Sequence, residues 1–329
     1  MGARLPARHS GEPHIVWIVD WTDREQADFV AAFTEMGVEP CIIRSRPTGA
    51  TVGTKWHHLY SYPAYLKLAV RAMTSRADVV VAWQPLAAML LAYVPRRPAL
   101  IAIEPVIVEH DRRLLGRFTR RAVKRIDRLV MCSEGVAARL IATGLAPEQV
   151  VVIRRGVTPV ESREGPGDDY LLAGGREHRD WITLREAASG VDLPVRLGAP
   201  NAPPEGGSLE LLPPLNRMDY VEQLRHARAL IVPLKDDTRG AGLLAILEAY
   251  SYGVPVIASR NIATVDYVID GAGVLVEPAD VDGLRGAMRE MSRPEIATTA
   301  SAAATALAHS ELSLVHFVRR VQELARQLG

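Results

Sequence analysis

The sequence has few of the residues that build disulfide frameworks or metal sites, because its 329 residues include only two cysteines. Cys41 and Cys132 stand far apart, each in a short apolar run, and match neither a metal-ligand spacing nor a disulfide pattern. We therefore expect both thiols to stay reduced in a cytoplasmic protein. Hydrophobic residues make up 48% of the chain, which is enough for a large core, and the length predicts two domains.

Signals for membrane insertion and secretion are also missing. The longest apolar stretch, residues 79–94, is interrupted by Gln84 and Pro85 and is too short for a membrane span. The N-terminal segment MGARLPARHSGEP carries charges and prolines without the apolar centre of a signal peptide. These absences predict a cytoplasmic location. A peripheral position at the inner face of the membrane is left open by the charge distribution.

Two common phosphate-binding motifs are absent as well. The first strand, expected at residues 14–20, is followed by WTDREQ, where a dinucleotide-binding Rossmann domain would carry its glycine-rich turn. No segment of the chain has the glycine and lysine spacing of a P-loop. A nicotinamide-binding domain and a P-loop nucleotidase are therefore disfavoured.

Charge is present in both signs but is divided unevenly. Residues 1–155 contain 22 Lys and Arg against 14 Asp and Glu, whereas residues 156–329 contain 17 against 24. Eight of the basic residues lie in residues 111–128, where apolar positions repeat at helical spacing. The basic face of this expected helix is either simply solvated or meets an anionic acceptor or membrane surface. We expect no nucleic-acid partner.

Strand-like and helical segments alternate along both halves, which predicts an α/β fold with doubly wound parallel sheets. Residues 156–169 are rich in turn formers and form the expected linker. An amphipathic helix, with Ser310 as its N-cap, is expected to end the chain. The expected strands are residues 14–20, 39–43, 77–82, 99–103, 129–133 and 150–153, then 170–173, 194–197, 209–212, 229–233, 254–258 and 273–276.

The second half is organised around residues 238–259, TRGAGLLAILEAYSYGVPVIAS. Gly240 and Gly242 stand where a loop turns into an apolar helix. Gly253 and the proline two residues after it end this helix. Glu248 lies roughly 9 Å from Gly242 at a rise of ~1.5 Å per residue, about the distance from a diphosphate to the ribose of one nucleotide. A phosphate at the helix N-terminus and a ribose at Glu248 fit this spacing. Alternatively, Glu248 pairs with a buried arginine or a backbone N–H.

Three segments carry a resemblance to a known family: VVIRRGV (151–157), LAGGREHRD (172–180) and GLLAILEAYSYGVPVIA (242–258). In sequence and order they resemble the donor domain of family-4 glycosyltransferases of the GT-B fold. The resemblance implies two Rossmann-like domains facing across a cleft. These are an acceptor domain (1–156), with the C-terminal helix (311–329) packed back on it, and a donor domain (157–310). It also implies retaining transfer from a nucleotide-diphosphate sugar, with a UDP-sugar expected, and no metal.

The resemblance implies particular donor-site residues. The family's diphosphate-binding basic pair corresponds to Arg176 and Arg179, although both could be ordinary surface arginines, and its ribose-binding glutamate corresponds to Glu248. Position 240, where the family pattern has a first glutamate, is glycine here, as in a glycine-led subset of the family. The donor-side candidates also include Arg239, Gly240, Ala241, Gly242, Leu243 and Asn216.

Catalytic and acceptor residues are harder to identify. The family's catalytic histidine has no counterpart after the strand at 99–103, where Glu104 stands in a position that would face the cleft. Glu104 and Asp237 are the catalytic candidates, and the acceptor-side candidates are Trp21, Trp83 and His110. A lone histidine such as His110 is also common on an ordinary surface. Asp280 and Asp282 form a D-x-D motif that a helix N-cap explains without a metal.

Two other functions stay open. A nucleotide-sugar epimerase shares the fold and would need acids and a histidine at the cleft. A catalytically inactive protein that binds a nucleotide or a partner is consistent with Gly240 and with the missing histidine. The nucleotide base, the sugar, the acceptor and the oligomeric state are not specified by the sequence.

Overall fold

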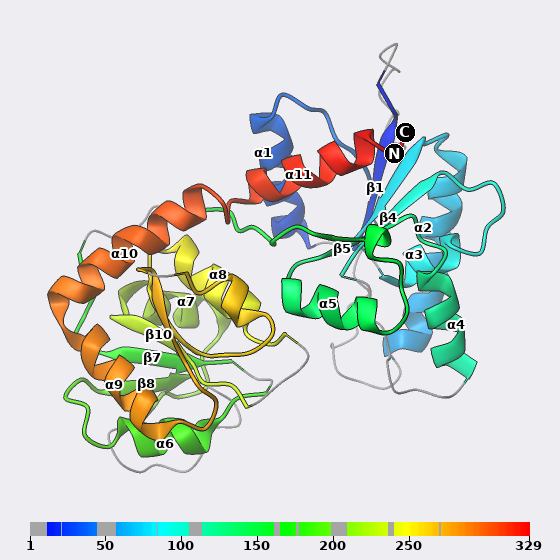
Figure 1. Cartoon of the computed structure of the whole chain (residues 1–329). Coiled ribbons are helices and arrows are strands. Elements are labelled where there is room, and N and C mark those ends of the chain that lie inside the picture. The colour runs from blue at the N-terminus through cyan, green and yellow to red at the C-terminus, as the bar shows by residue number, and fades with distance from the viewer. Residues whose placement is uncertain are drawn as a thin grey trace. The chain divides into compact units, whose positions relative to one another are not determined.

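The computed structural model forms two compact units, each built on one six-stranded sheet (Figure 1). Unit 1 comprises residues up to 132 with 137–153 and 317–329, and unit 2 comprises residues 133–136 and 154–316. Within them the structure describes residues 12–20, 22–44, 57–83, 85–104, 114–160, 165–175, 178–198, 209–235, 240–269 and 271–329.

The sheet of unit 1 is parallel throughout, in the order β2-β1-β3-β4-β5-β6. Its inner strands consist almost entirely of buried aliphatic residues, as expected where helices cover both faces. The order reverses between β1 and β3, the type of position at which doubly wound sheets bind ligands. The strands are β1 (Ile15–Val19), β2 (Cys41–Arg44), β3 (Val79–Ala82), β4 (Ala99–Ile103), β5 (Arg128–Met131) and β6 (Val150–Val152).

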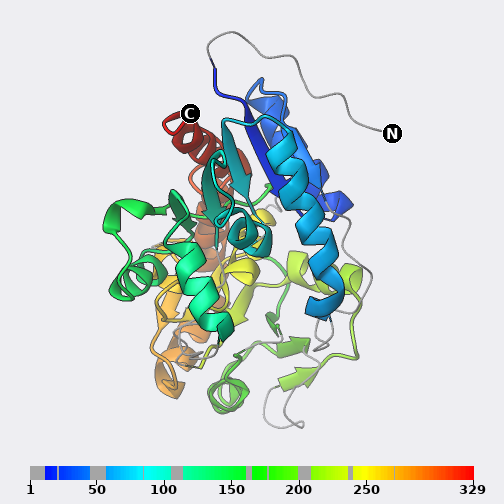
Figure 2. The same cartoon turned by 90° about the vertical axis from the view of Figure 1, so that its right-hand side faces the viewer.

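Helices flank this sheet. Figure 2 shows the long helix α2 lying along its strands. The first helix begins with a capping box, in which Thr22 and Glu25 satisfy each other's backbone N–H groups. The helices of unit 1 are α1 (Asp23–Glu35), α2 (His57–Thr74), α3 (Pro85–Leu91), α4 (Leu114–Val123), most of α5 (Glu134–Ala142), the short η1 (Pro147–Gln149) and most of α11 (Leu314–Arg326).

An aromatic cluster holds the last helix within unit 1. Phe317 of α11 meets Trp83 edge to face at 5.5 Å, and the other side of Trp83 meets Phe29 of α1 at 5.1 Å. Phe317 is fully buried. The C-terminal helix therefore packs as a component of the unit that the N-terminal half builds.

The sheet of unit 2 is also parallel, in the order β12-β11-β10-β7-β8-β9. One core joins α7 and α8 to one face of the sheet, and a second core joins α6 and α9 to the other. The strands are β7 (Leu171–Gly174), β8 (Val195–Gly198), β9 (Leu209–Leu211), β10 (Ala229–Val232), β11 (Val256–Ser259) and β12 (Gly273–Val276). The helices are α6 (Trp181–Ala188), α7 (Arg217–His226), α8 (Leu243–Ser251), η2 (Thr264–Asp266), α9 (Val281–Ser292) and α10 (Pro294–His309).

The segment that enters the main part of unit 2 after residue 153 is paired with the segment that leaves it before residue 317. The Val157 N–H donates to the Leu312 carbonyl, and the Leu314 N–H donates to the Val157 carbonyl, both at 2.8 Å. A Cβ at Gly156 would lie 2.2 Å from the Ser313 carbonyl oxygen, so this close pairing requires glycine.

The predicted fold class is confirmed, since each expected strand is present and both sheets are parallel and doubly wound. The two cysteines are free and buried. Among the described residues, no helix is long and apolar enough to cross a membrane.

Two helix boundaries differ from expectation. Ser310 is not an N-cap but follows α10, an alanine-rich helix whose high helix propensity carries it to His309, and α11 begins only at Leu314. The basic helix expected over residues 111–128 is helical at Leu114–Val123 in the described part. It ends early because its last turn tightens into i→i−3 hydrogen bonds, Arg125 to Ala122 and Ile126 to Val123, before β5 begins.

Candidate donor site

Of the described donor-side candidates, Arg179 follows the carboxyl end of β7, and Gly240 and Gly242 follow that of β10, where the strand order of unit 2 reverses. The loops that follow these two strands are tied together by backbone hydrogen bonds. The Asp180 N–H donates to the Pro233 carbonyl, and the Lys235 N–H donates to the His178 carbonyl, each at 3.0 Å. Asp180 then caps α6, accepting from the Thr183 N–H and hydroxyl. The chain at Arg179 is thus fixed on both sides.

Arg179 is a buried residue of this edge, with 9% of its surface exposed. Its Nε donates to the Gly174 carbonyl at 2.9 Å. Gly175 has a φ of +110°, and a Cβ there would lie 2.4 Å from the guanidinium. Burial lowers the pKa of Arg179 from its ordinary value. The side chain nevertheless stays charged at neutral pH. Gly175 of LAGGREHRD therefore leaves the space that this arginine occupies.

Tyr220 of α7 connects Arg179 to the next element. Its ring lies against Gly174, where a Cβ would come within 2.7 Å of it. Burial, with a further contribution from the charge of Glu248, raises the pKa of Tyr220 to about 12, while Arg179 and Arg217 act in the opposite direction. The phenol is therefore neutral and lies among three charged side chains.

Glu248 of α8 is paired with Arg217, the first residue of α7. Arg217 Nη1 donates to Glu248 Oε2 at 3.0 Å, and Nη2 contacts Oε1. The Glu248 side chain is 18% exposed and that of Arg217 60%. The alternative considered from the sequence anticipated a buried arginine, whereas the observed partner is largely exposed.

Asn216 stands immediately before Arg217 and is the N-cap of α7. Its Oδ1 accepts from the backbone N–H groups of Met218 and Asp219 at 2.9 and 3.0 Å. This cap fixes the start of α7 and hence the position from which Arg217 extends. A contact between Asn216 and the donor stays a prediction.

The glycine-led start of α8 has the predicted geometry. Gly240 and Gly242 have φ values of +73° and +99°, and Gly242 is the N-cap, so the helix begins at Leu243. A Cβ on Gly242 would lie 3.1 Å from Leu234 and 3.3 Å from Val232. No side chain of the described residues caps this first turn. Its N–H groups and the positive end of the helix dipole are thus suited to an anion. Gly253, with a φ of +66°, follows the helix end as expected.

A polar network that was not predicted from the sequence holds the backbone just before α8. Asn261 Oδ1 accepts from the N–H groups of Ala263 and Thr264, both at 2.8 Å, and Asn261 Nδ2 donates to the Ala241 carbonyl at 3.1 Å. The Thr264 hydroxyl donates to the Ser259 carbonyl at 2.9 Å. The Asx turn is local, and the N-x-x-T spacing could have suggested it. The bond from Asn261 to the Ala241 carbonyl joins segments 20 residues apart, and no local pattern indicates it.

The unit 1 candidates are engaged in structural contacts. Glu104 has a φ of +46° at the end of β4, and its Oε1 accepts from the Cys132 N–H at 2.6 Å. Trp83 packs between Phe29 and Phe317. These contacts do not test a role in catalysis or acceptor binding, which stays a prediction for both residues.

Several candidates lie outside the described residues: Arg176, Asp237 and Arg239 on the donor side, and Trp21 and His110 on the acceptor side. Among the described residues, no group of three His, Cys, Asp or Glu side chains is arranged to hold a metal ion. Asp280 is the N-cap of α9, accepting from the Gly283 N–H at 2.8 Å, and Asp282 pairs with Arg285.

Both halves of the sequence match family models. A model described as Glycosyltransferase Family 4 matches residues 11–161, and one described as Glycosyl transferases group 1 matches residues 206–294. No curated protein matches the sequence.

Solved structures of similar fold cover nearly the whole chain. A sucrose-phosphate synthase from Thermosynechococcus elongatus has a TM-score of 0.68 at 15% identity, covering 96% of this chain and 99% of its own. Anabaena HepE in complex with UDP-glucose has a TM-score of 0.68 at 14% identity, with 95% and 99% covered. A glycosyltransferase from Rickettsia africae has a TM-score of 0.65 at 13% identity, with 97% and 99% covered. At these identities the likeness establishes the shared fold.

Proposed function

Since this chain belongs to the family 4-like glycosyltransferases of the GT-B fold, we propose that it transfers a sugar from a UDP-sugar to an acceptor hydroxyl with retention of anomeric configuration. Unit 2 holds the donor in this proposal, and unit 1 holds the acceptor. The UDP moiety is proposed because HepE, which shares the fold, is described in complex with UDP-glucose.

The proposal is carried by the spacing of two groups on α8, the N–H groups at its start and the Glu248 carboxylate. Gly242 starts the helix with an uncapped first turn, and Glu248 follows six residues later, roughly 9 Å away at ~1.5 Å per residue. In the proposed complex the diphosphate accepts hydrogen bonds from the first-turn N–H groups, and Glu248 accepts hydrogen bonds from the ribose hydroxyls. Arg179, at the adjacent loop, supplies a permanent positive charge.

These groups would assist the departure of the diphosphate. Cleavage of the bond between the anomeric carbon and the phosphate oxygen places negative charge on that oxygen. Donors that already point at this position stabilise the charge without reorganising. The helix terminus, Arg179 and Arg176 then supply the positive charge that a divalent cation supplies in other transferases, and we propose a metal-independent reaction. Asp237, Arg239, Ala241 and Leu243 are proposed to line the sugar and phosphate positions.

The acceptor is proposed to be anionic or membrane-associated, on the evidence of the basic helix α4 in unit 1. Five described basic residues lie between Arg117 and Arg125, and the described acid closest in sequence, Asp127, is already paired with Arg97. Glu104 is the catalytic candidate on this unit, at the carboxyl end of β4.

A ligand screen followed by product analysis tests the proposal. UDP, GDP, ADP and dTDP, each with and without a sugar, are compared by thermal shift, because a ligand that binds only the folded state raises Tm by mass action. Selective stabilisation by UDP and a UDP-sugar is expected, together with a transferred sugar in the products. An isomerised sugar nucleotide without transfer would indicate an epimerase instead. Absence of stabilisation by any nucleotide would contradict the donor site.

A further inference from the structure

A second anion-binding feature lies in unit 1, on α4. Three basic residues of this helix, and a fourth directly after its end, are related by spacings of three and four residues. They therefore form one stripe along the helix. The opposite side of the helix is buried, through Gly116, Thr119 and Ala122. The stripe consists of Arg117, Arg120, Arg121 and Lys124.

This stripe forms one wall of a cavity of about 310 Å³. Thr143 and Leu145, from the segment after α5, also line it. No acidic residue is among the described residues that line the cavity. Arg117, Arg121 and Lys124 form no ion pair with any residue of the described chain. Like charges at these spacings repel one another, and an anion bound among them would relieve that repulsion.

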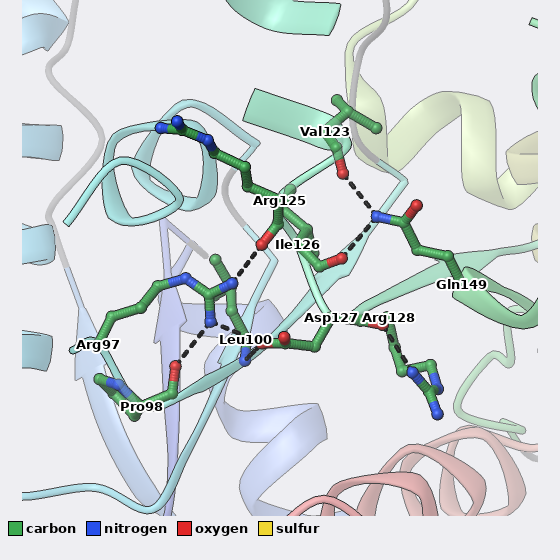
Figure 3. A network of polar contacts seen from close by, with 9 residues as sticks. All are labelled: Arg97, Pro98, Leu100, Val123, Arg125, Ile126, Asp127, Arg128 and Gln149. Carbon is green, nitrogen blue, oxygen red and sulfur yellow. Dashed lines mark hydrogen bonds and ion pairs between the residues drawn. The ribbon is translucent and has the colours of Figure 1, made fainter. Parts of the chain in front are cut away.

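The stripe is not needed to cap the helix, because other side chains already do so. Figure 3 shows the Gln149 amide reaching the carbonyl oxygens of Val123 and Ile126, at 2.7 and 2.5 Å. Arg97 contacts the carbonyl oxygen of Arg125 and also pairs with Asp127. The Val123 carbonyl of α4 and the Arg125 and Ile126 carbonyls that follow the helix are therefore satisfied by Gln149 and Arg97.

The same amide fixes the geometry of the cavity. Gln149 belongs to η1, which follows Thr143 and Leu145 in the chain, and it is hydrogen-bonded to the end of the helix that carries the stripe. Arg125, by contrast, does not belong to the cavity lining, since its guanidinium lies over the Tyr93 ring at 4.8 Å. Gln149 therefore links the two segments that line the cavity without lining it itself.

We propose that this cavity binds a phosphate group. Guanidinium groups present paired N–H donors that match phosphate oxygens, and three of the four cations are arginines. Val123 and Leu145 supply an apolar part of the wall, suited to the non-polar portion of a phosphorylated ligand. The phosphate has two sources, a phospholipid headgroup or a soluble phosphorylated molecule. The inference rests on the anionic acceptor proposed above for α4 and narrows its chemistry to a phosphate. It does not depend on the proposed donor chemistry, since all of its residues belong to unit 1.

The test compares Arg117→Gln/Arg121→Gln with the matched variant Arg24→Gln/Arg71→Gln, which removes two exposed helical arginines of the same unit outside the cavity. Pyrophosphate binding is measured by calorimetry in the presence of saturating UDP, so that the proposed donor site does not contribute. In parallel, each protein is sedimented with phosphatidylcholine vesicles with and without phosphatidylglycerol. UDP binding alone and Tm are measured for every protein, so that a failure of the donor proposal is seen separately.

We expect the cavity variant to lose at least about tenfold either in pyrophosphate affinity or in binding to anionic vesicles. The matched variant is expected to keep both. Pyrophosphate binding identifies a soluble phosphate, and vesicle binding without it identifies a headgroup. Wild-type protein that binds neither probe, or equal losses in the two variants, would overturn the proposal. UDP affinity is expected to stay unchanged in the cavity variant.

Discussion

Arg217 donates to both carboxylate oxygens of Glu248, with Nη1 lying 3.0 Å from Oε2 and Nη2 in contact with Oε1. A carboxylate has about four lone-pair positions, so this fork occupies only half of them. The remaining positions are free to accept hydrogen bonds from a ribose diol. Arg217 therefore orients Glu248 for the proposed ligand without blocking it, and the pair links the start of α7 to the middle of α8.

Replacing Glu248 with Gln is expected to weaken UDP-sugar binding by roughly 1.5 to 3 kcal/mol while leaving the fold intact, because a charged acceptor for the diol is lost. Calorimetry measures the affinity, and Tm reports the fold. Glu290→Gln, an exposed glutamate on α9, is the matched control and should bind as the wild type does. Unchanged affinity of the Glu248 variant would remove the ribose role.

Changing Arg176 and Arg179 together to Ala is expected to abolish transfer, because both are proposed to contact the diphosphate. The effect should be much larger for UDP than for uridine, which lacks phosphates, and calorimetry with the two ligands separates these contributions. Equal losses for UDP and uridine would place the arginine pair away from the phosphates.

Local signals allowed much of unit 2 to be predicted. Gly240, Gly242 and Gly253 take positive φ values as their positions before and after an apolar helix suggested, because backbone conformation at glycine is a local property. The alternation of strands and helices predicted both sheets for the same reason. The start of α11 was wrong because the alanine-rich α10 was not recognised, although its composition alone favours a helix.

Contacts between distant segments could not be predicted. Arg217 and Glu248 are 31 residues apart, and neither neighbourhood carries a pattern that pairs them. The burial of Arg179 depends on the space left by Gly175, which only the folded sheet edge reveals. The role of Gln149 in closing the end of α4 likewise joins segments that are separate in sequence. Arg176 came from family resemblance alone.

Tyr220 is expected to make stability depend on alkaline pH. Its pKa is raised to about 12 in the folded protein, against 10.0 ordinarily, so the unfolded chain loses this proton first as the pH rises. The contribution of Tyr220 to the free energy of unfolding is complete below pH 10 and is lost between pH 10 and 12. The loss amounts to about 2 to 3 kcal/mol. Urea unfolding across this range should show a flatter decline for Tyr220→Phe than for the wild type. Parallel profiles would show that the phenol titrates normally.

Gly175→Ala is expected to displace Arg179 and so to weaken UDP binding. The added Cβ would lie 2.4 Å from the guanidinium, at a backbone φ of +110° that alanine rarely adopts. Two effects therefore combine, backbone strain and a clash with Arg179, and they need to be separated. Gly165→Ala separates them, because Gly165 has a φ of +87° in the same unit and a Cβ there meets nothing within 4 Å.

The Gly165 variant should lose about 1 to 3 kcal/mol of stability from strain and keep its affinity for UDP. The Gly175 variant should lose comparable or greater stability and, in addition, at least about tenfold in UDP affinity, because a charged donor to the diphosphate has moved. Urea unfolding measures the first quantity and calorimetry the second, with the folded fraction confirmed before titration. If the Gly175 variant bound UDP as tightly as the Gly165 variant, Arg179 would have no part in holding the diphosphate, and its burial would serve the fold of the β7 loop alone.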